Sequence, residues 1–203
     1  MIPAIEHGAA LLTLAATFGY LLGSVPFGLV ITRALGLGDL RQIGSGNIGA
    51  TNVLRTGNKP AALATLLLDS GKGAIAVLIA RALIGEDAAQ IAGAAAFFGH
   101  VYPIWLKFNG GKGVATFLGT LLALAWPVGL AACGLWALTA AVSRISSLSA
   151  LVAAALAVPA ALLLGRPEVT LLTLLLAALV FWRHRSNIGR ILAGTEPKIG
   201  KKK

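Results

Sequence analysis

The sequence predicts an all-α integral membrane protein with seven transmembrane helices. Of its 203 residues, 57% are hydrophobic and only 12% are charged, and the mean hydropathy is +0.85. Soluble domains contain about 25% charged residues, so a soluble protein with a large core is the weaker alternative. The apolar residues also form runs near the length of about 20 helical residues that a bilayer crossing needs.

Seven apolar segments follow one another, and we expect each to be a helix of one domain over residues 1–203. They lie at 9–32, 60–84, 88–106, 114–125, 127–142, 147–164 and 168–183. The first two are long enough to span, and the third and sixth are adequate. The fourth and fifth, divided at Trp126–Pro127, are short, so they form either a re-entrant pair or two short crossing helices. The charge distribution favours two helices.

The basic residues predict the orientation. With seven crossings, all 17 Lys and Arg residues except Arg81 and Arg166 fall on or toward one side. Positive charge marks the cytoplasmic side, so we expect the N-terminus outside and the C-terminus in the cytoplasm. The net charge of +10 suits membrane lipid with anionic headgroups or an anionic substrate, and nucleic acid is not an expected partner.

The stretch GSGNIG at residues 44–49 matches the glycine fingerprint of dinucleotide-binding proteins. That fingerprint requires a soluble βαβ unit, whereas here it follows a membrane helix, so we reject a nucleotide site. The glycines still allow backbone N–H groups to converge on an anion. An ordinary polar turn is the alternative, but a loop of about two dozen residues is longer than a turn needs. The candidate phosphate-binding residues here are Gly44, Ser45, Gly46, Asn47, Asn52 and Arg55.

A second glycine-rich stretch precedes the helix expected from residue 114. Gly110, Gly111 and Gly113 flank Lys112, and amides at a helix N-terminus beside a lysine form a phosphate-binding arrangement. The spacing is not that of a Walker A loop, so ATP is not implied. We expect both glycine-rich loops to lie on the same face of the membrane.

Three further ionisable residues lie within the apolar segments, Asp69 near the middle of the membrane and His100 near its interface. Asp69 and Lys72 are three residues apart on a helix that Pro60 could start, so they can pair. Intramembrane charges usually face an interior or a cavity, and a structural ion pair is slightly favoured over a functional role. His100 is either a general base or a residue that orients a loop. The chain has 3 histidines and no carboxylate cluster beside them, so we expect no metal site.

The C-terminal stretch FWRHRSNIGRILAGTEP at 181–197 carries more polar groups than membrane anchoring requires. Arg183 and Arg185 alone would be ordinary cytoplasmic anchors. An amphipathic interfacial tail is the alternative to a site. The additional groups are His184, Asn187, Arg190 and Glu196, and a serine cluster on the same face consists of Ser146, Ser147 and Ser149. These serines either cap the sixth helix or bind the anion expected at the glycine-rich loops, and capping is favoured for most of them.

Four blocks together resemble a known family. GSGNIGATNVLR, FGHVYPIWLKFNGGKGVAT and RHRSNIGRILAGTEP resemble the signature blocks of the bacterial acyl-phosphate:glycerol-3-phosphate acyltransferases, the PlsY type. LLLDSGKG resembles the second helix of that family, and the resemblance covers nearly the whole chain in order. It implies seven helices in the bacterial inner membrane, with the active site at the cytoplasmic face.

The resemblance also implies an activity. An acyl group passes from acyl phosphate to the sn-1 hydroxyl of glycerol 3-phosphate, giving lysophosphatidic acid and phosphate in phospholipid synthesis. It implies no cofactor and no obligate protein partner. Ser45, Arg55 and Lys112 then bind substrate phosphates, and His184 and Asn187 are an active-site pair. Asn47 and Asn52 would shape the first loop. Apart from the resemblance, we expect Arg190, like Asp69, Lys72 and His100, to be a structural or orienting residue.

One position departs from the family pattern, which has a serine where this chain has Ala150. Ser149 stands one residue earlier, and we expect it to contribute to the phosphate site in its place.

No Ser/His/Asp arrangement is evident, so an acyl-enzyme is not expected. The main alternative function is transport of an organic phosphate. Against it, the polar motifs gather on one face and no inverted repeat is visible, whereas transporter sites lie near the midplane. A structural scaffold gives no reason for so many phosphate-type donors on one side.

Overall fold

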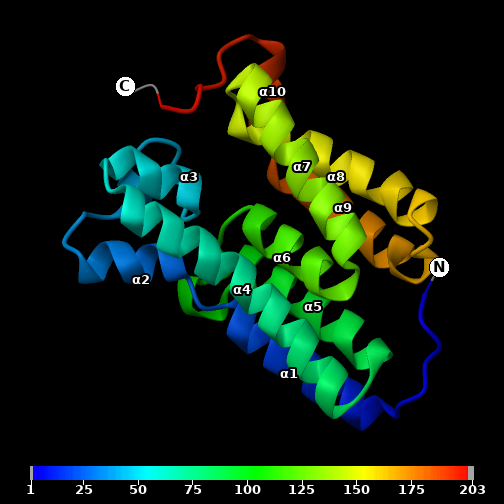
Figure 1. Cartoon of the computed structure of the whole chain (residues 1–203). Coiled ribbons are helices and arrows are strands. Elements are labelled where there is room, and N and C mark those ends of the chain that lie inside the picture. The colour runs from blue at the N-terminus through cyan, green and yellow to red at the C-terminus, as the bar shows by residue number, and fades with distance from the viewer. Residues whose placement is uncertain (1, 201–203) are drawn as a thin grey trace.

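The computed structural model describes residues 2–200, and every regular element in that range is helical (Figure 1). The α-helices are α1 (Ala9–Gly23), α2 (Phe27–Ala34), α3 (Ala50–Val53), α4 (Lys59–Leu83), α5 (Glu86–Val101), α6 (Val114–Leu124), α7 (Trp126–Ser143), α8 (Ser146–Leu163), α9 (Thr170–Arg183) and α10 (Arg185–Leu192). The 3-10 turns are η1 (Leu40–Gln42), η2 (Leu54–Thr56), η3 (Ile104–Leu106) and η4 (Pro167–Val169). Each predicted apolar segment therefore contains a helix.

Prolines move several predicted boundaries. The first segment breaks before Pro26, because proline removes a backbone donor and clashes with the preceding turn. The third ends at Val101 rather than at residue 106, because the residue before Pro103 disfavours helix. Pro60, in contrast, lies in the first turn of α4, where Asn58 accepts a hydrogen bond from the amide of Ala61.

Four spans are long and apolar enough to cross a membrane: Ala9–Ala34, Lys59–Leu83, Trp126–Ser143 and Ser146–Leu163. The number becomes five if Pro167–Arg183 and Arg185–Leu192, which meet at 62°, are taken together. At 1.5 Å per residue, the 11 residues of α6 cover about 16 Å, roughly half of the hydrocarbon thickness. Seven crossings therefore remain a prediction, although α6 and α7 are separate helices as expected.

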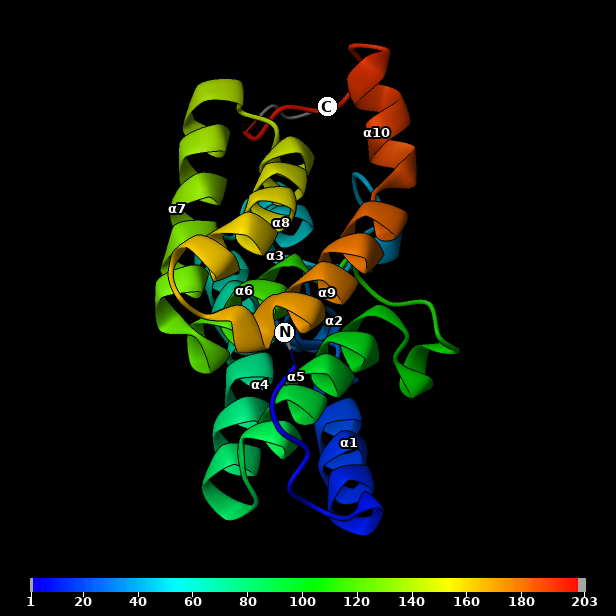
Figure 2. The same cartoon turned by 90° about the vertical axis from the view of Figure 1, so that its right-hand side faces the viewer.

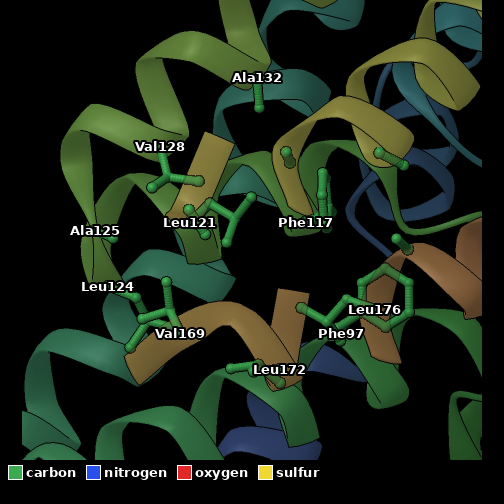
Figure 3. Close-up of a cluster of buried hydrophobic side chains, with 14 of the residues drawn as sticks. Phe97, Phe117, Leu121, Leu124, Ala125, Val128, Ala132, Val169, Leu172 and Leu176 are labelled. Atoms are coloured by element: carbon green, nitrogen blue, oxygen red, sulfur yellow. The ribbon is translucent and has the colours of Figure 1, made fainter. Parts of the chain in front are cut away.

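Small residues allow the helices to approach closely. α1 packs along α5, where Gly23 lies so near the backbone of Ala96 that a Cβ would overlap it. Gly119 of α6 meets the backbone of Ser70 on α4 in the same way. Such contacts replace hydrophobic association, which is absent between helices in lipid. A larger core, with Phe97, Phe117 and other side chains pointing toward one another, joins α5, α6, α7 and α9 (Figure 3).

The turns separate into two ends of the helix bundle. The turn from α7 to α8 and helix α10 lie together, opposite the turn from α4 to α5 (Figure 2). Arg81 and Arg166 share the second end, where both donate to the carbonyl of Leu124. At the first end, Ser146 pairs with Thr51 of α3. The two basic residues that the sequence assigned to the minority side thus lie together, although which side is cytoplasmic remains a prediction.

Candidate functional site

The first glycine-rich loop is built around the side chain of Asn52, which is 1% exposed. Its Nδ2 donates to the carbonyls of Leu40 and Ile43, each at 2.9 Å. Its Oδ1 accepts from the amide of Ser45 at 3.2 Å and from Arg55 at 3.2 Å. Both ends of the amide are engaged, so Asn52 shapes the loop, and the expectation that it also binds phosphate is corrected.

Two glycines give this loop its turn. Gly44 and Gly46 have φ values of 56° and 69°, which residues with a Cβ rarely adopt. Gly44 also faces the Arg55 side chain, where a Cβ would lie 2.6 Å from Nη1. Arg55 therefore packs against Gly44 and bonds Asn52 within the loop. Ser45 and Asn47 lie on the open side and line a cavity.

The second glycine-rich loop is fixed from two directions. The amides of Gly110 and Gly111 donate to the carbonyls of Val101 and His100, each at 3.1 Å. Arg183 of α9 donates to the carbonyls of the same two glycines, at 3.0 and 3.3 Å. The amides of these glycines are thus bonded within the protein, which corrects the expectation that they point at an anion. Gly113, with φ 82°, packs on Phe97 and begins α6.

Lys112 lies between these glycines and heads a chain of polar contacts. Its Nζ donates to Oδ1 of Asn187 on α10, and Nδ2 of Asn187 donates to Glu196. Ser147 and Arg190 donate to the same carboxylate at 2.7 and 2.6 Å. Burial lowers the pKa of Lys112 to about 8, with Arg190, Arg183 and Arg55 lowering it further and Glu196 opposing them.

The segment after α10 folds back over this chain of contacts. The amide of Ile199 donates to the carbonyl of Arg144 at 2.7 Å, which ties the segment to the turn between α7 and α8. Glu196 thereby points inward to Asn187 and Arg190. The pKa of Glu196 is lowered by the hydrogen bonds from Ser147, Asn187 and Arg190, which outweigh its desolvation. Glu196 thus joins Arg190 to Asn187.

His184 lies in the sharp turn between α9 and α10 and is 3% exposed. Its Nδ1 is 2.8 Å from the carbonyl of Val180. Because a carbonyl only accepts, Nδ1 holds the proton and Nε2 is an acceptor. Burial lowers the pKa of His184 to about 4, so the ring is neutral at pH 7.

Ser149 does not face the site. It is fully buried, and its hydroxyl donates to the carbonyl of Ile145 at 2.9 Å within its own helix. The expectation that it binds phosphate is therefore corrected. Ser147, two residues earlier, is the serine of this segment that reaches the polar network.

Both loops and the start of α10 surround a polar cavity of about 270 Å³. Five predicted residues line it, together with three that the sequence reasoning did not assign to the site. The lining consists of Ser45, Gly46, Asn47, Gly110, Lys112, Arg183, Arg185 and Ser186. Arg183 was interpreted as a membrane anchor, although its place beside His184 was the available signal. The cavity thus brings hydroxyl, amide and cationic donors together from residues far apart in the chain.

Comparison with known proteins gives a consistent answer. Residues 13–194 match the family described as glycerol-3-phosphate acyltransferase. The chain is 72% identical over 200 residues to the glycerol-3-phosphate acyltransferase of Cereibacter sphaeroides (strain ATCC 17025 / ATH 2.4.3), covering 98% of this chain and 95% of the relative. It is 69% identical over 201 residues to that of Jannaschia sp. (strain CCS1), covering 99% of each.

Two solved structures share the fold. The crystal structure of PlsY, an integral membrane glycerol 3-phosphate acyltransferase, in its glycerol 3-phosphate form matches with a TM-score of 0.88 and 39% identity, covering 93% of this chain and 96% of the other. The lysophosphatidic acid form matches with a TM-score of 0.86 and 38% identity, covering 93% and 95%. These matches define an integral membrane acyltransferase. The chain belongs to the glycerol-3-phosphate acyltransferase family of the PlsY type.

Proposed function

We propose that this acyltransferase uses acyl phosphate as its donor and acylates the sn-1 hydroxyl of glycerol 3-phosphate. The observation that carries the proposal is the cavity in which Ser45, Lys112 and Arg183 converge from three separate segments. Both substrates carry a phosphate, and a site that binds two phosphates needs several fixed donors and cations. Transport of an organic phosphate is not favoured, because the chain belongs to an acyltransferase family.

The proposed reaction is a direct transfer. The acceptor hydroxyl oxygen attacks the acyl carbon, the bond from that carbon to the phosphate oxygen breaks, and the hydroxyl proton passes to the departing phosphate. Acyl phosphate is an activated mixed anhydride, so positioning and charge stabilisation suffice. Ser45, Lys112, His184 and Asn187 are the proposed catalytic residues. The first two line the cavity, Asn187 accepts a hydrogen bond from Lys112, and His184 immediately precedes the helix that carries Asn187.

The acyl chain has a route from the membrane. An apolar groove of about 520 Å³ lies between α1 and α5 and includes Tyr20 and Phe98. Tyr20 donates to the carbonyl of Tyr102 at 2.9 Å, and the guanidinium of Arg183 lies 5.4 Å from the centre of the Tyr102 ring. The groove therefore leads toward a residue that lines the polar cavity, and we propose that the donor chain lies along it.

We further propose that seven helices cross the bacterial inner membrane with the N-terminus outside. The cavity then lies at the cytoplasmic face of that membrane. The support is that Lys112, Arg183 and Arg185 line the cavity, whereas Arg81 and Arg166 lie together at the other end. Cysteine labelling at the two ends in intact cells tests the orientation. Labelling of a cysteine at Lys107 from outside would contradict it.

The decisive assay for the activity is phosphate release by the purified protein in lipid. Palmitoyl phosphate is supplied with and without glycerol 3-phosphate, and lysophosphatidic acid is measured alongside. We expect acceptor-dependent release that Lys112→Ala abolishes and that Lys107→Ala, a change of an exposed lysine in the same loop, leaves intact. Saturable uptake of glycerol phosphate into sealed vesicles without release would favour transport instead.

A further inference from the structure

A buried cluster of three ionisable side chains lies outside the lining of the cavity and takes no part in the proposed reaction. Asp69 and Lys72 on α4 are each 2% exposed, and His100 on α5 is 4% exposed. Nζ of Lys72 lies 3.0 Å from Oδ1 of Asp69, and Nδ1 of His100 lies 3.6 Å from the same oxygen. An ion pair between Asp69 and Lys72 offsets the free-energy cost of burying these two charges, but it does not account for the presence of His100.

One end of this cluster supports the first glycine-rich loop. Nζ of Lys72 donates to the carbonyl of Val25 at 2.8 Å, and Val25 lies in the break between α1 and α2. Gly28 of α2 approaches the carbonyl of Ile48 so closely that a Cβ would overlap it. Ile48 lies inside the loop that carries Ser45. Lys72 thus holds the start of the helix on which this loop rests.

The other end supports the second loop. The ring of His100 lies against Gly111, where a Cβ would overlap Nε2. The backbone carbonyl of His100 accepts from the amide of Gly111. The hydroxyl of Thr116 in the first turn of α6 donates to the carbonyl of Asp69 at 2.8 Å. The ring of His100 thus supports Gly111, while the backbone carbonyls of His100 and Asp69 hold Gly111 and Thr116, so the residues on both sides of Lys112 are held by the segments that carry the cluster.

We propose that Asp69, Lys72 and His100 are positioning residues that hold the two glycine-rich loops at one separation, so that Ser45 and Lys112 face the same phosphate-binding cavity. The inference rests on the phosphate-binding role proposed for Lys112. A plain ion pair within α4 would explain stability alone. It would not explain why the contacts of the cluster end at the supports of both loops.

The test compares Asp69→Asn, Lys72→Met and His100→Leu for KM, kcat and melting temperature in lipid. Misplacing a binding group by about 1 Å can reduce activity by up to about a hundredfold. We expect KM for glycerol 3-phosphate to rise about tenfold, with kcat changing much less. His100→Gln, which retains a hydrogen-bonding group, should restore most of the affinity.

Two further variants separate positioning from stability. Asp87, at the opposite end of α5, is another buried carboxylate that pairs with a histidine, since its Oδ1 lies 2.9 Å from Nδ1 of His7. Asp87→Asn should therefore lower the melting temperature without changing KM. The double variant Asp69→Asn/Lys72→Met leaves no unpaired buried charge. It should fold stably and still show the raised KM, which decides the matter even if a single variant fails to fold.

The pH profile supplies an independent readout. Arg55, Arg183, Arg190 and Glu196 are the charged groups that act on Lys112, and all remain in these variants. In His100→Leu the alkaline limit of kcat/KM should move to higher pH, because a displaced Lys112 is better hydrated. Unchanged KM and pH profile with only a lower melting temperature would overturn the positioning role and leave the proposed function intact. Acceptor-dependent release by Lys112→Ala at the wild-type rate would instead refute the phosphate-binding role proposed for Lys112, on which the positioning role rests.

Discussion

The pKa of Lys112 makes the reaction sensitive to mildly alkaline pH. Burial places this pKa at about 8, compared with 10.5 for an ordinary lysine. A lysine that binds a phosphate must be protonated. Since the deprotonated form accumulates above the pKa, kcat/KM should fall as pH rises through 8 and should be constant below it.

The size of the effect follows from the two pKa values. Between pH 7 and pH 9, a group with a pKa of about 8 goes from about 90% to about 10% protonated, so kcat/KM should fall about tenfold. With a pKa of 10.5, the protonated fraction would change by only about 3%. A substrate phosphate monoester is already a dianion in this range, since its second pKa is about 6.

The assay is phosphate release from palmitoyl phosphate at glycerol 3-phosphate concentrations well below KM, between pH 6.5 and 9.5. The pH at which kcat begins to fall should be higher than that for kcat/KM, because a bound phosphate stabilises the charged lysine. Glu196→Gln should move the limit of kcat/KM to lower pH, because Glu196 raises the pKa of Lys112. Glu168→Gln, which removes the partner of Arg166 at the other end of the bundle, should not move it. A flat profile up to pH 9 would refute the reasoning.

Three more predictions follow from single contacts. The pKa of His184 falls from 6.5 to about 4 on folding, so the unfolded chain binds the additional proton between these values. Stability should therefore be full above pH 6.5 and decrease by about 3 kcal/mol as pH falls toward 4, and His184→Gln should remove this part of the slope in thermal unfolding. Gly111→Ala places a Cβ against the His100 ring and should raise KM for glycerol 3-phosphate in the release assay. Asn52→Leu leaves two backbone carbonyls without their donor, so chemical denaturation should show a loss of about 2 kcal/mol or more.

Each of these has a matched control. His7→Gln changes a histidine at the opposite end of the bundle, where Asp87 pairs with it, and should not remove the slope assigned to His184. Gly57→Ala and Gly134→Ala concern glycines with nothing within 4 Å of an added Cβ, and Gly134, in a helix without positive φ, is the better comparison for Gly111. Asn47→Leu alters an amide on the open side of the loop and should change affinity more than stability. Equal stability loss in the two asparagine variants would contradict the role assigned to Asn52.

Hydropathy predicted the helical segments because burial in lipid requires long apolar runs. It placed boundaries less well, because a break in the helix depends on single residues such as Pro26 and Pro103. It also could not establish seven crossings. The ends of α6 are set by the non-helical backbone angles of Gly113 and Ala125, and a mean hydropathy does not report backbone angles.

The composition of the loops predicted where the site lies but not what each residue does. Asn47 and Asn52 have the same side chain in the same loop, yet one lines the cavity and the other is buried. The difference depends on tertiary contacts, because Asn52 faces the carbonyls of residues 40 and 43 only after η1 turns back toward α3. Residue type alone cannot distinguish a donor directed at a ligand from one directed at the backbone.

The same argument explains why Asp69 and Lys72 remained ambiguous in the sequence. Their spacing of three residues predicts the ion pair, and the pair forms. Spacing along one helix cannot show that Lys72 also reaches Val25 or that His100 approaches the same carboxylate. Those contacts join α4 to the break between α1 and α2 and to α5, and they extend a local ion pair to the supports of two loops. A role in positioning Lys112 could therefore be inferred only after the helices had been placed together.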